Sequence, residues 1–402
     1  MSLVSVPQQV AILGAGPIGL DAALAVSDRG WPFTVYEAAT SVGGTVREWG
    51  HVRMFTPWDM NSSPRMRAHL QAAGVPVPSG SSYPTGAQFA EALLNQVAAL
   101  PALAGRIELG TKVEGIGREG LLKHEEIATA ARGQRPFRLL LSQTGGHERI
   151  AHADLVLDCT GSYSNPNFLG DGGIAAPGER AIAERITRRL PDLEAERDEW
   201  AGRTILLVGA GKSAQTAARD LAELVQEAPG TRVVWAVRNQ SPNWGVVIDD
   251  PLSERQALVD DSRRLAAGEV PGLEVRTGVA VEALARGHGR IAVTLRSAAD
   301  GIQDVVVDRV LSLVGYCPDA SLYRQLQVHE CYATAAPMQL SAALLGSAAG
   351  DCLQQSSHGV DALRNPEPNF FILGMKSYGR NSQFLLRIGY DQVGEVTTAY
   401  AA

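Results

Sequence analysis

The chain has 402 residues, 45% hydrophobic and 20% charged, so it is long enough for roughly two to three domains and too apolar for wholesale disorder. Its net charge of −7 and the lack of a basic stripe argue against nucleic-acid binding. No run of about 18 apolar residues predicts a membrane span, and no signal-peptide pattern opens the chain, so we expect a cytoplasmic protein. The four cysteines form no C-x-x-C pair, which argues against a disulfide scaffold, a zinc site and a dithiol redox centre.

The N-terminal segment has the pattern of a dinucleotide-binding unit. Residues 9–13 predict a buried parallel strand, 18–28 predict a helix, and 33–36 predict the next strand. The first turn carries G-x-G-x-x-G, whose glycines allow a tight turn, close approach of a pyrophosphate and close helix packing: Gly14, Gly16 and Gly19. Glu37 follows the second strand, where a carboxylate accepts a hydrogen bond from a ribose 2′-hydroxyl.

The same pattern recurs in the second half of the chain. Residues 203–208 predict a strand, 213–226 a helix and 233–237 a second strand. The turn between the first strand and the helix supplies the residues that we expect to hold a second dinucleotide: Gly209, Gly211, Lys212, Ser213 and Ala214. Arg238 stands where the first half has its acid. A guanidinium pairs with a 2′-phosphate, so this site is predicted to prefer NADP over NAD.

The two halves repeat beyond their glycine turns. Residues 106–114 resemble 273–282, and each stretch is followed by the alternating pattern of a hairpin. Each half then closes with an apolar strand and a glycine, Gly161 in one and Gly315 in the other. The first half is longer by about 40 residues, and most of the excess lies within 43–101.

The C-terminal part predicts a strand over 369–373 and a closing helix over 383–399. A strand there can return to the first sheet, which inserts the second half within the first. The sequence therefore predicts an α/β protein with two Rossmann-like domains, each doubly wound and three-layered, the first at 1–165 and 330–402 and the second at 166–329.

These features together resemble the flavoproteins with two dinucleotide-binding domains. Within them the chain is more similar to flavin-containing monooxygenases and Baeyer–Villiger-type enzymes than to the thioredoxin-reductase-like disulfide reductases. The segments that carry the resemblance are Gly14–Gly19, Glu37, Gly43–Thr45, Asp158–Gly161, Gly209–Ala214, Arg238 and Gly315–Pro318. The resemblance implies FAD in the first domain and NADPH in the second. It also implies further FAD contacts from Gly43, Gly44, Thr45 and Trp49.

The resemblance implies a monooxygenase that acts on a small-molecule substrate with O2 and NADPH-reduced flavin. The charge and the lack of a long apolar run argue against nucleic acid or a membrane as a partner. The family pattern F-x-G-x-x-x-H begins here at Phe168 but ends on Ile174. The missing histidine keeps a second hypothesis open, an NADPH-dependent reductase, dehydrogenase or oxidase without oxygen insertion. A third hypothesis, of another class, is a redox-sensing regulatory flavoprotein. A homodimer is the base-rate expectation.

Three residues are candidates for the chemistry itself. Asn61, in the extra segment of the first half with Trp49, Arg53 and Trp58, is a candidate for the flavin face; core packing of a long connection is the alternative for this segment. Lys376 and Arg380 follow the C-terminal strand, where open α/β sheets bind ligands. Either cation is placed to stabilise negative charge on reduced flavin, and a solvated loop is the alternative.

The remaining signals favour simpler interpretations. The eight histidines show no ligand spacing, so no metal site is expected. Cys352 and His358 flank a segment that we interpret as a mobile connection, with a cysteine–histidine relay as the alternative. The charged run 179–200 predicts a solvated linking helix, broken near Pro191.

Overall fold

The structure is a computed structural model that describes residues 6–287, 289–346, 353 and 355–400. It divides into two compact units: unit 1 comprises Met1–Asn165 and Cys317–Ala402, and unit 2 comprises Pro166–Tyr316. Residues 317–329, which the sequence analysis assigned to the second domain, belong to unit 1. They do so because Leu322 and Tyr323 pack in the same apolar cluster as Phe370.

Unit 1 is built on a five-stranded parallel sheet with the order β18-β7-β1-β2-β3. The strands are β1 (Val10–Leu13), β2 (Phe33–Tyr36), β3 (Ile107–Glu108), β7 (Leu155–Asp158) and β18 (Phe370–Ile372). Leu13 at the end of β1 lies opposite Tyr36 on one side and Asp158 on the other. The central strands are buried on both faces, which explains why they are continuous apolar runs.

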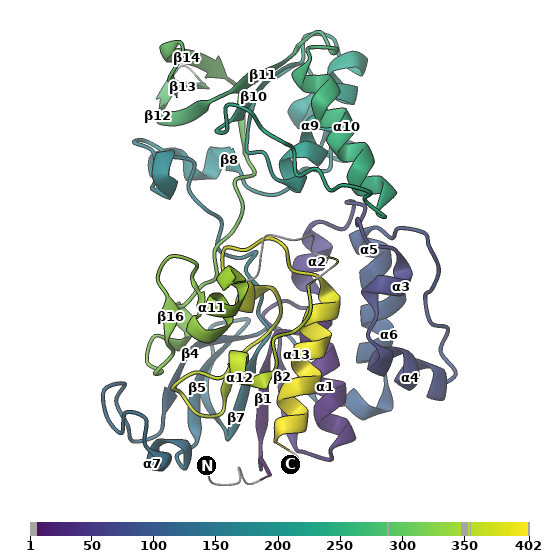
Figure 1. Cartoon of the computed structure of the whole chain (residues 1–402), viewed down its shortest axis with the longest axis vertical. Helices are drawn as coiled ribbons and strands as arrows, with labels where there is room; N and C mark the ends of the chain where they lie inside the picture. The colour runs from purple at the N-terminus through teal and green to yellow at the C-terminus, as the bar shows by residue number, and fades with distance from the viewer. Residues whose placement is uncertain (1–5, 288, 347–352, 354, 401–402) are drawn as a thin grey trace. The chain divides into compact units, whose positions relative to one another are not determined.

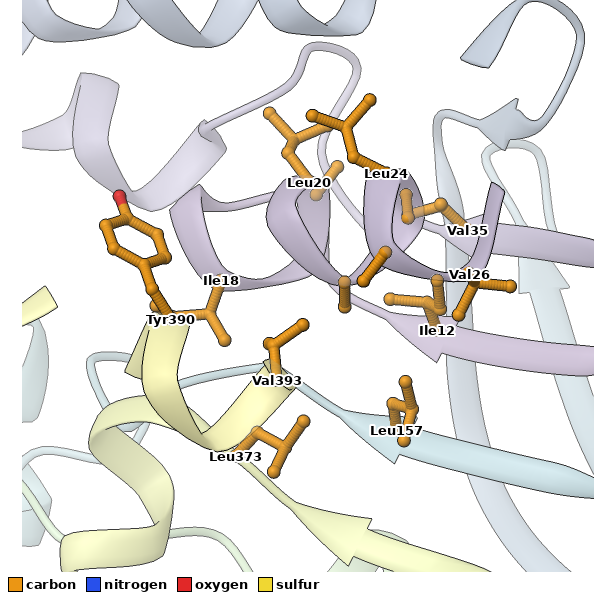
Figure 2. Packing of buried hydrophobic residues seen from close by; sticks show 14 of the residues in the cluster. Ile12, Ile18, Leu20, Leu24, Val26, Val35, Leu157, Leu373, Tyr390 and Val393 are labelled. Atoms are coloured by element: carbon orange, nitrogen blue, oxygen red, sulfur yellow. The ribbon is translucent and has the colours of Figure 1, made fainter. Parts of the chain in front are cut away.

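Helices cover one face of this sheet. The helices α1 (Pro17–Asp28) and α13 (Leu386–Ala399) run side by side in Figure 1, in purple and yellow. Ile18 of α1 lies next to Tyr390 and Val393 of α13, and all three are at most 6% exposed (Figure 2). Removing this much apolar surface from water contributes about 1.5–3 kcal/mol for each large side chain.

The other face is covered by an antiparallel sheet of β4 (Thr111–Arg118), β5 (Phe137–Gln143) and β6 (Glu148–Ala153). Phe137, Leu139 and Leu141 of β5 pack in one cluster with Leu13 and Val156 of the parallel sheet. Unit 1 therefore has three layers, as the sequence predicted.

The extra segment of the first half is mostly helical. It forms α2 (Gly44–Glu48), α3 (Trp58–Asn61), α4 (Pro64–Ala72), α5 (Gly86–Phe89), the π-helix η1 (Ala90–Leu94), α6 (Asn95–Ala98) and the 3₁₀-helix η2 (Pro101–Leu103). Buried Asp21 of α1 anchors it, because its carboxylate accepts hydrogen bonds from Ser63 and from Arg65, the latter at 2.6 Å.

Short elements complete unit 1. They are α7 (Ala130–Gly133), η5 (Ser321–Tyr323), β16 (Glu330–Cys331), β17 (Ala336–Pro337), α11 (Met338–Gly346), α12 (Val360–Leu363) and η7 (Gly374–Tyr378). A buried ion-pair cluster ties α7 to the antiparallel sheet: Glu367 pairs with Arg118 of β4 at 2.6 Å and with Arg132 of α7 at 2.9 Å.

Unit 2 repeats the plan with the parallel order β11-β10-β9-β15-β8. Its elements are β8 (Ile186–Thr187), β9 (Thr204–Val208), α9 (Lys212–Glu227), β10 (Arg232–Val237), α10 (Ser253–Ala266), β11 (Leu273–Thr277), β12 (Val279–Gly287), β13 (Arg290–Ser297), β14 (Gly301–Val307) and β15 (Arg309–Ser312). Strands β12 to β14 form the antiparallel sheet, and α10 packs on α9 (Figure 1).

The predicted linking helix over 179–200 is wrong. The segment holds a 3₁₀ stretch (η4, Arg180–Arg185), the strand β8 and one helical turn (α8, Arg197–Trp200), and a further 3₁₀ turn (η3, Asp171–Gly173) precedes it. Ile186 pairs with Val310 of β15, so burial in the sheet decides the structure here rather than helix propensity.

Candidate dinucleotide sites

The first glycine turn joins β1 to α1. Gly14 has a φ of +92°, which favours glycine, and a Cβ there would lie 2.9 Å from the Cys159 carbonyl oxygen. A Cβ on Gly19 would lie 1.8 Å from the carbonyl oxygen of Gly14, so no side chain fits at this crossing of helix and turn. Gly16 differs, because a Cβ there would meet no atom within 4 Å. A side chain therefore has no room at Gly14 or Gly19, whereas the space beside Gly16 is open.

The open position lies at the start of α1. Gly16 is the N-cap residue and has no side-chain cap, and Pro17 after it has no amide hydrogen, so the amides that this end of the 12-residue helix offers begin at Ile18. Such amides and the helix dipole favour an anion. The cradle fits a pyrophosphate that contacts the backbone. A side chain at Gly16 would block that contact.

Glu37 completes the first turn from β2. Its carboxylate accepts hydrogen bonds from the amides of Ala15 (2.6 Å) and Ala39 (2.8 Å). Gly43 reaches the same turn, since its amide donates to the Ala15 carbonyl at 3.0 Å, and a Cβ on Gly44 would lie 2.4 Å from that of Ala39. Glu37 and the Gly43–Gly44 pair therefore surround one loop.

Two other predicted contacts lie on α2 and just beyond it. Thr45 is exposed in the first turn of α2. Trp49 packs against Gly86, where a Cβ would lie 2.6 Å from its ring. Its Nε1 is buried and has no hydrogen-bond partner in the described part of the chain.

Lys376 forms a buried ion pair at the carboxyl end of the sheet. Its Nζ donates to Asp158 Oδ2 at 2.7 Å and to Thr160 Oγ1 at 3.1 Å, and its side chain is 2% exposed. Asp158 is the last residue of β7, beside the end of β1. The pair joins the loop after β7 to the loop after β18. Lys376 is thus held by a carboxylate that sequence reasoning did not assign to it.

The other two catalytic candidates have different surroundings. Asn61 is 1% exposed; its Oδ1 accepts from the Thr56 hydroxyl (2.6 Å) and its Nδ2 donates to the Thr56 carbonyl (2.9 Å). Its own carbonyl accepts from Tyr390 of α13 at 2.8 Å. Arg380 is exposed, and its amide donates to the Thr334 carbonyl. These contacts hold Asn61 to its own segment and to α13.

The second glycine turn repeats the first. Gly209 has a φ of +130°, and a Cβ there would lie 2.3 Å from the Leu313 carbonyl oxygen. Gly211, the N-cap of the 16-residue helix α9, has no atom within 4 Å of such a Cβ. Ala214 is fully buried at the third position. This cradle also fits a pyrophosphate, so both turns meet the requirement of a dinucleotide.

Side chains around the second turn are polar. Ser213 is exposed, and Lys212 donates from Nζ to the Trp244 carbonyl at 3.1 Å. Gln215 donates to the same carbonyl at 3.2 Å, a contact that the sequence did not suggest. Arg238 is exposed directly after β10. A hydrogen bond from Arg296 holds the pKa of the Asp171 carboxyl below its ordinary value, and the charge of Arg238 adds to this effect.

The described residues contain no cluster of three or more potential metal ligands, and none of their helices is long and apolar enough to cross a membrane. The cysteines at 159, 317 and 331 are free, and burial raises the pKa of the Cys159 thiol well above its ordinary value. Cys352 lies outside the described residues, and His358 is exposed.

The comparisons with known proteins come from structure. No protein-family model matches the sequence, and a search of curated proteins finds no match. The bacillithiol disulfide reductase Bdr from Bacillus cereus aligns over 98% of both chains, with a TM-score of 0.70 and 19% identity. The FAD-bound cadaverine monooxygenase DfoA from Erwinia amylovora aligns over 98% of this chain and 94% of its own, with a TM-score of 0.67 and 12% identity. The ornithine hydroxylase PvdA from Pseudomonas aeruginosa aligns over 98% and 99%, with a TM-score of 0.65 and 15% identity.

These likenesses confirm the predicted fold. The chain has the architecture of the two-dinucleotide-binding-domain flavoproteins, with a second Rossmann-like unit placed within the first. A reductase and two monooxygenases share this architecture, so the likeness shows the fold and leaves the activity to the chemistry of the site.

Proposed function

We propose that the chain is an FAD- and NADPH-dependent oxidoreductase. The observation that carries the proposal is the pair of glycine turns, each at the carboxyl end of a parallel sheet and each open at its middle glycine. Glu37 follows the first turn and Arg238 the second. One carboxylate and one guanidinium at equivalent places suit two different nucleotides.

In unit 1 the amides at the start of α1 would bind the FAD pyrophosphate. Glu37 keeps acceptor capacity beyond its two backbone partners and would take the ribose hydroxyl. Gly43 and Gly44 would admit the cofactor next to the same loop. Buried Asp158 and Lys376 fix the loops after β7 and β18, where ligands of open α/β sheets bind.

In unit 2 the amides at the start of α9 would bind the NADPH pyrophosphate, with Ser213 as a further donor. Lys212 and Arg238 supply positive charge, and Arg238 would pair with the 2′-phosphate. When bound, FAD supplies the redox chemistry, accepting a hydride from NADPH and passing electrons to O2 or to an organic acceptor. The protein groups bind, orient and exclude water.

The finer proposal is a monooxygenase of small molecules. The sequence has no C-x-x-C pair, so it lacks the closely spaced dithiol motif typical of disulfide reductases of this fold. The fold is shared with a cadaverine monooxygenase and an ornithine hydroxylase, which makes nucleophilic amines the first substrates to test, followed by sulfides and carbonyl compounds.

The test measures how NADPH oxidation is coupled to product. The purified FAD-loaded protein is reduced anaerobically with NADPH and then mixed with O2 and each candidate substrate. We expect one substrate to give an oxygenated product in nearly one-to-one ratio with NADPH, with little H2O2. H2O2 alone for every substrate, or electron transfer to a quinone or dye without oxygen, would replace the monooxygenase by the second candidate.

That second candidate is an NADPH-dependent reductase without oxygen insertion. Ile174 favours it, because this residue, 72% exposed, stands where the flavin-monooxygenase pattern F-x-G-x-x-x-H has its histidine. The likeness to a bacillithiol disulfide reductase favours it too. Rapid flavin reduction by NADPH with negligible turnover for any acceptor would instead favour a redox-sensing role.

A further inference from the structure

A pocket of about 570 Å³ lies within unit 1, in the extra segment that unit 2 does not have. This is the size of pocket that small-molecule ligands occupy. Unit 2 builds its glycine cradle without any such segment, so the pocket lies outside the part that the two units share. Its lining residues are therefore the place to look for a further ligand.

Two stretches of backbone build one wall. Residues 52–59 and 80–86 run antiparallel, held by hydrogen bonds from the Met54 amide to Pro84 (2.8 Å), from the Gly86 amide to Val52 (3.0 Å) and from the Trp58 amide to Ser82 (3.1 Å). A bridge between Arg53 and Thr85 belongs to the same ladder. The wall is thus fixed by the backbone.

The helix that begins at Gly86 builds the other wall. It starts with a capping box between Thr85 and Gln88 and continues through η1 to α6. The π-turn closes with the Asn95 amide bonded to the Ala90 carbonyl, and its residue Glu91 lines the pocket. π-Turns within helices are frequent at functional sites, since they redirect side chains.

The two charged side chains that line the pocket differ in their ion-pair partners. Glu91 pairs with Arg47 at 2.5 Å and accepts from Asn95 at 2.6 Å, and the hydrogen bond from Arg47 holds the pKa of Glu91 below its ordinary value. Arg53 is exposed and, within the described residues, makes one side-chain hydrogen bond, from Nη1 to the Tyr83 carbonyl at 3.3 Å, and no ion pair. One guanidinium thus remains available to an anion.

The apolar lining comes from aromatic rings. Trp58 and Tyr83 are partly exposed in the pocket, and Trp58 packs against Phe89 with ring centroids 6.4 Å apart. Rings of this kind bury a flat organic group, and a guanidinium binds a carboxylate through two parallel hydrogen bonds.

We propose that this pocket binds a small organic carboxylate with a flat apolar body, with the carboxylate on Arg53 and the body against Trp58 and Tyr83. Inorganic phosphate would use only the cation, and an aromatic amine only the rings. The proposal goes beyond the proposed redox function, because it assigns a ligand to a site that neither glycine turn contains.

The experiment measures binding by calorimetry on the FAD-loaded protein, with no turnover. The probes are acetate, benzoate and 2-naphthoate, with benzamide, benzylamine and phosphate as comparisons. We expect affinity to rise from acetate to benzoate to 2-naphthoate, and benzamide to bind about tenfold more weakly than benzoate or not at all. An excess of NADP⁺ should leave benzoate binding unchanged.

The variant Arg53→Met should weaken benzoate binding about ten- to hundredfold, and Trp58→Leu should weaken 2-naphthoate more than acetate. Arg138→Met, which removes an exposed arginine of β5 outside the pocket, is the matched control and should bind as the parent does. Arg53→Lys, which keeps the charge, covers the case in which Arg53→Met does not fold.

Three results would overturn the proposal. Benzoate binding that is unchanged in both Arg53 variants would place it elsewhere. A preference for benzylamine or phosphate would assign the pocket to another ligand class. Displacement of benzoate by NADP⁺ would make the pocket part of a nucleotide site. None of these results depends on turnover, so the proposed redox function stands or falls separately.

Discussion

Units 1 and 2 share one plan, but the strand at one edge of the sheet comes after the common motif in unit 1 and before it in unit 2. In unit 1 the strand beside β7 is β18, which comes from the C-terminus of the chain. In unit 2 the equivalent strand beside β15 is β8, which precedes the whole motif. The glycine turn, its two central strands and the antiparallel cover are the same in both. The common part is therefore the proposed dinucleotide cradle with its two strands and its cover, and the edge strand needs only a parallel direction.

The ends of the equivalent strands β7 and β15 differ in chemistry. Asp158 ends β7 and is neutralised by Lys376, whereas Ser312 ends β15. The Ser312 hydroxyl is buried and has no hydrogen-bond partner within the described residues. One unit thus holds its loops by charge at a position where the other has a small neutral group.

The largest effect is expected from Gly19→Val. The added side chain would collide with the Gly14 carbonyl, so unit 1 should lose about 4 kcal/mol or more, and FAD with it. Thermal unfolding and flavin content measure both losses. Gly16→Ala is the control: the apoprotein should unfold at the parent temperature but bind FAD poorly. Normal FAD binding by Gly16→Ala would refute the proposed cradle.

The second largest loss of stability is expected from breaking the buried ion pair between Asp158 and Lys376. Asp158→Asn leaves Lys376 charged and unpaired inside the protein, which costs about 3–5 kcal/mol, and Lys376→Met should do similar damage. The double variant should be less damaged than the sum of the two. Ser312→Ala, the matched change in unit 2, should alter stability by about 0.5 kcal/mol or less. Urea unfolding of the four variants compares them, and additive losses would mean that the pair acts independently.

The two nucleotide preferences should be separable. Glu37→Arg removes the acceptor for the ribose and places a cation beside the Ala15 and Ala39 amides, so FAD affinity should fall about a hundredfold. Flavin retention on purification and titration of the apoprotein measure this fall. Affinity for NADP⁺ should be unchanged, and full flavin content would remove Glu37 from the site.

The smallest effect is expected from Arg238→Ala. Loss of the guanidinium should raise KM for NADPH about tenfold and leave KM for NADH nearly constant. Steady-state assays with both cofactors give the ratio. If the ratio is that of the parent, Arg238 does not read the 2′-phosphate.

The predictable parts of the fold are the ones that local rules determine. The strand over 33–36 agrees with β2 at both ends, and the helix over 18–28 begins one residue late, at Ile18 instead of Pro17. The first strand of each unit, β1 and β9, is a mostly apolar run followed directly by a glycine, so a sequence pattern finds it. The two-residue strand β8 has no such signal, because only its pairing with β15 makes it a strand.

The candidate sites divide in the same way. The glycines and Glu37 follow from a motif with fixed spacing, and the structure brings them together. The partner of Lys376 lies 218 residues away, at Asp158, and no local pattern links the two. The pocket at Arg53 depends on a π-turn and on which arginine has a carboxylate partner, and both are properties of three-dimensional packing.

The chain leaves unit 1 and returns to it at neighbouring residues. The Cys317 amide donates to the Asn165 carbonyl at 2.9 Å, and Pro166 and Tyr316, the first and last residues of unit 2, form an antiparallel bridge. The ends of the inserted unit are therefore already closed, and its removal would leave a gap that a short linker can span. Residues 166–316 are therefore an insertion that can be removed. A gene that joins residue 165 to 317 through a few glycines would encode unit 1 alone. We expect residues 166–316 to fold separately, because they contain their own sheet.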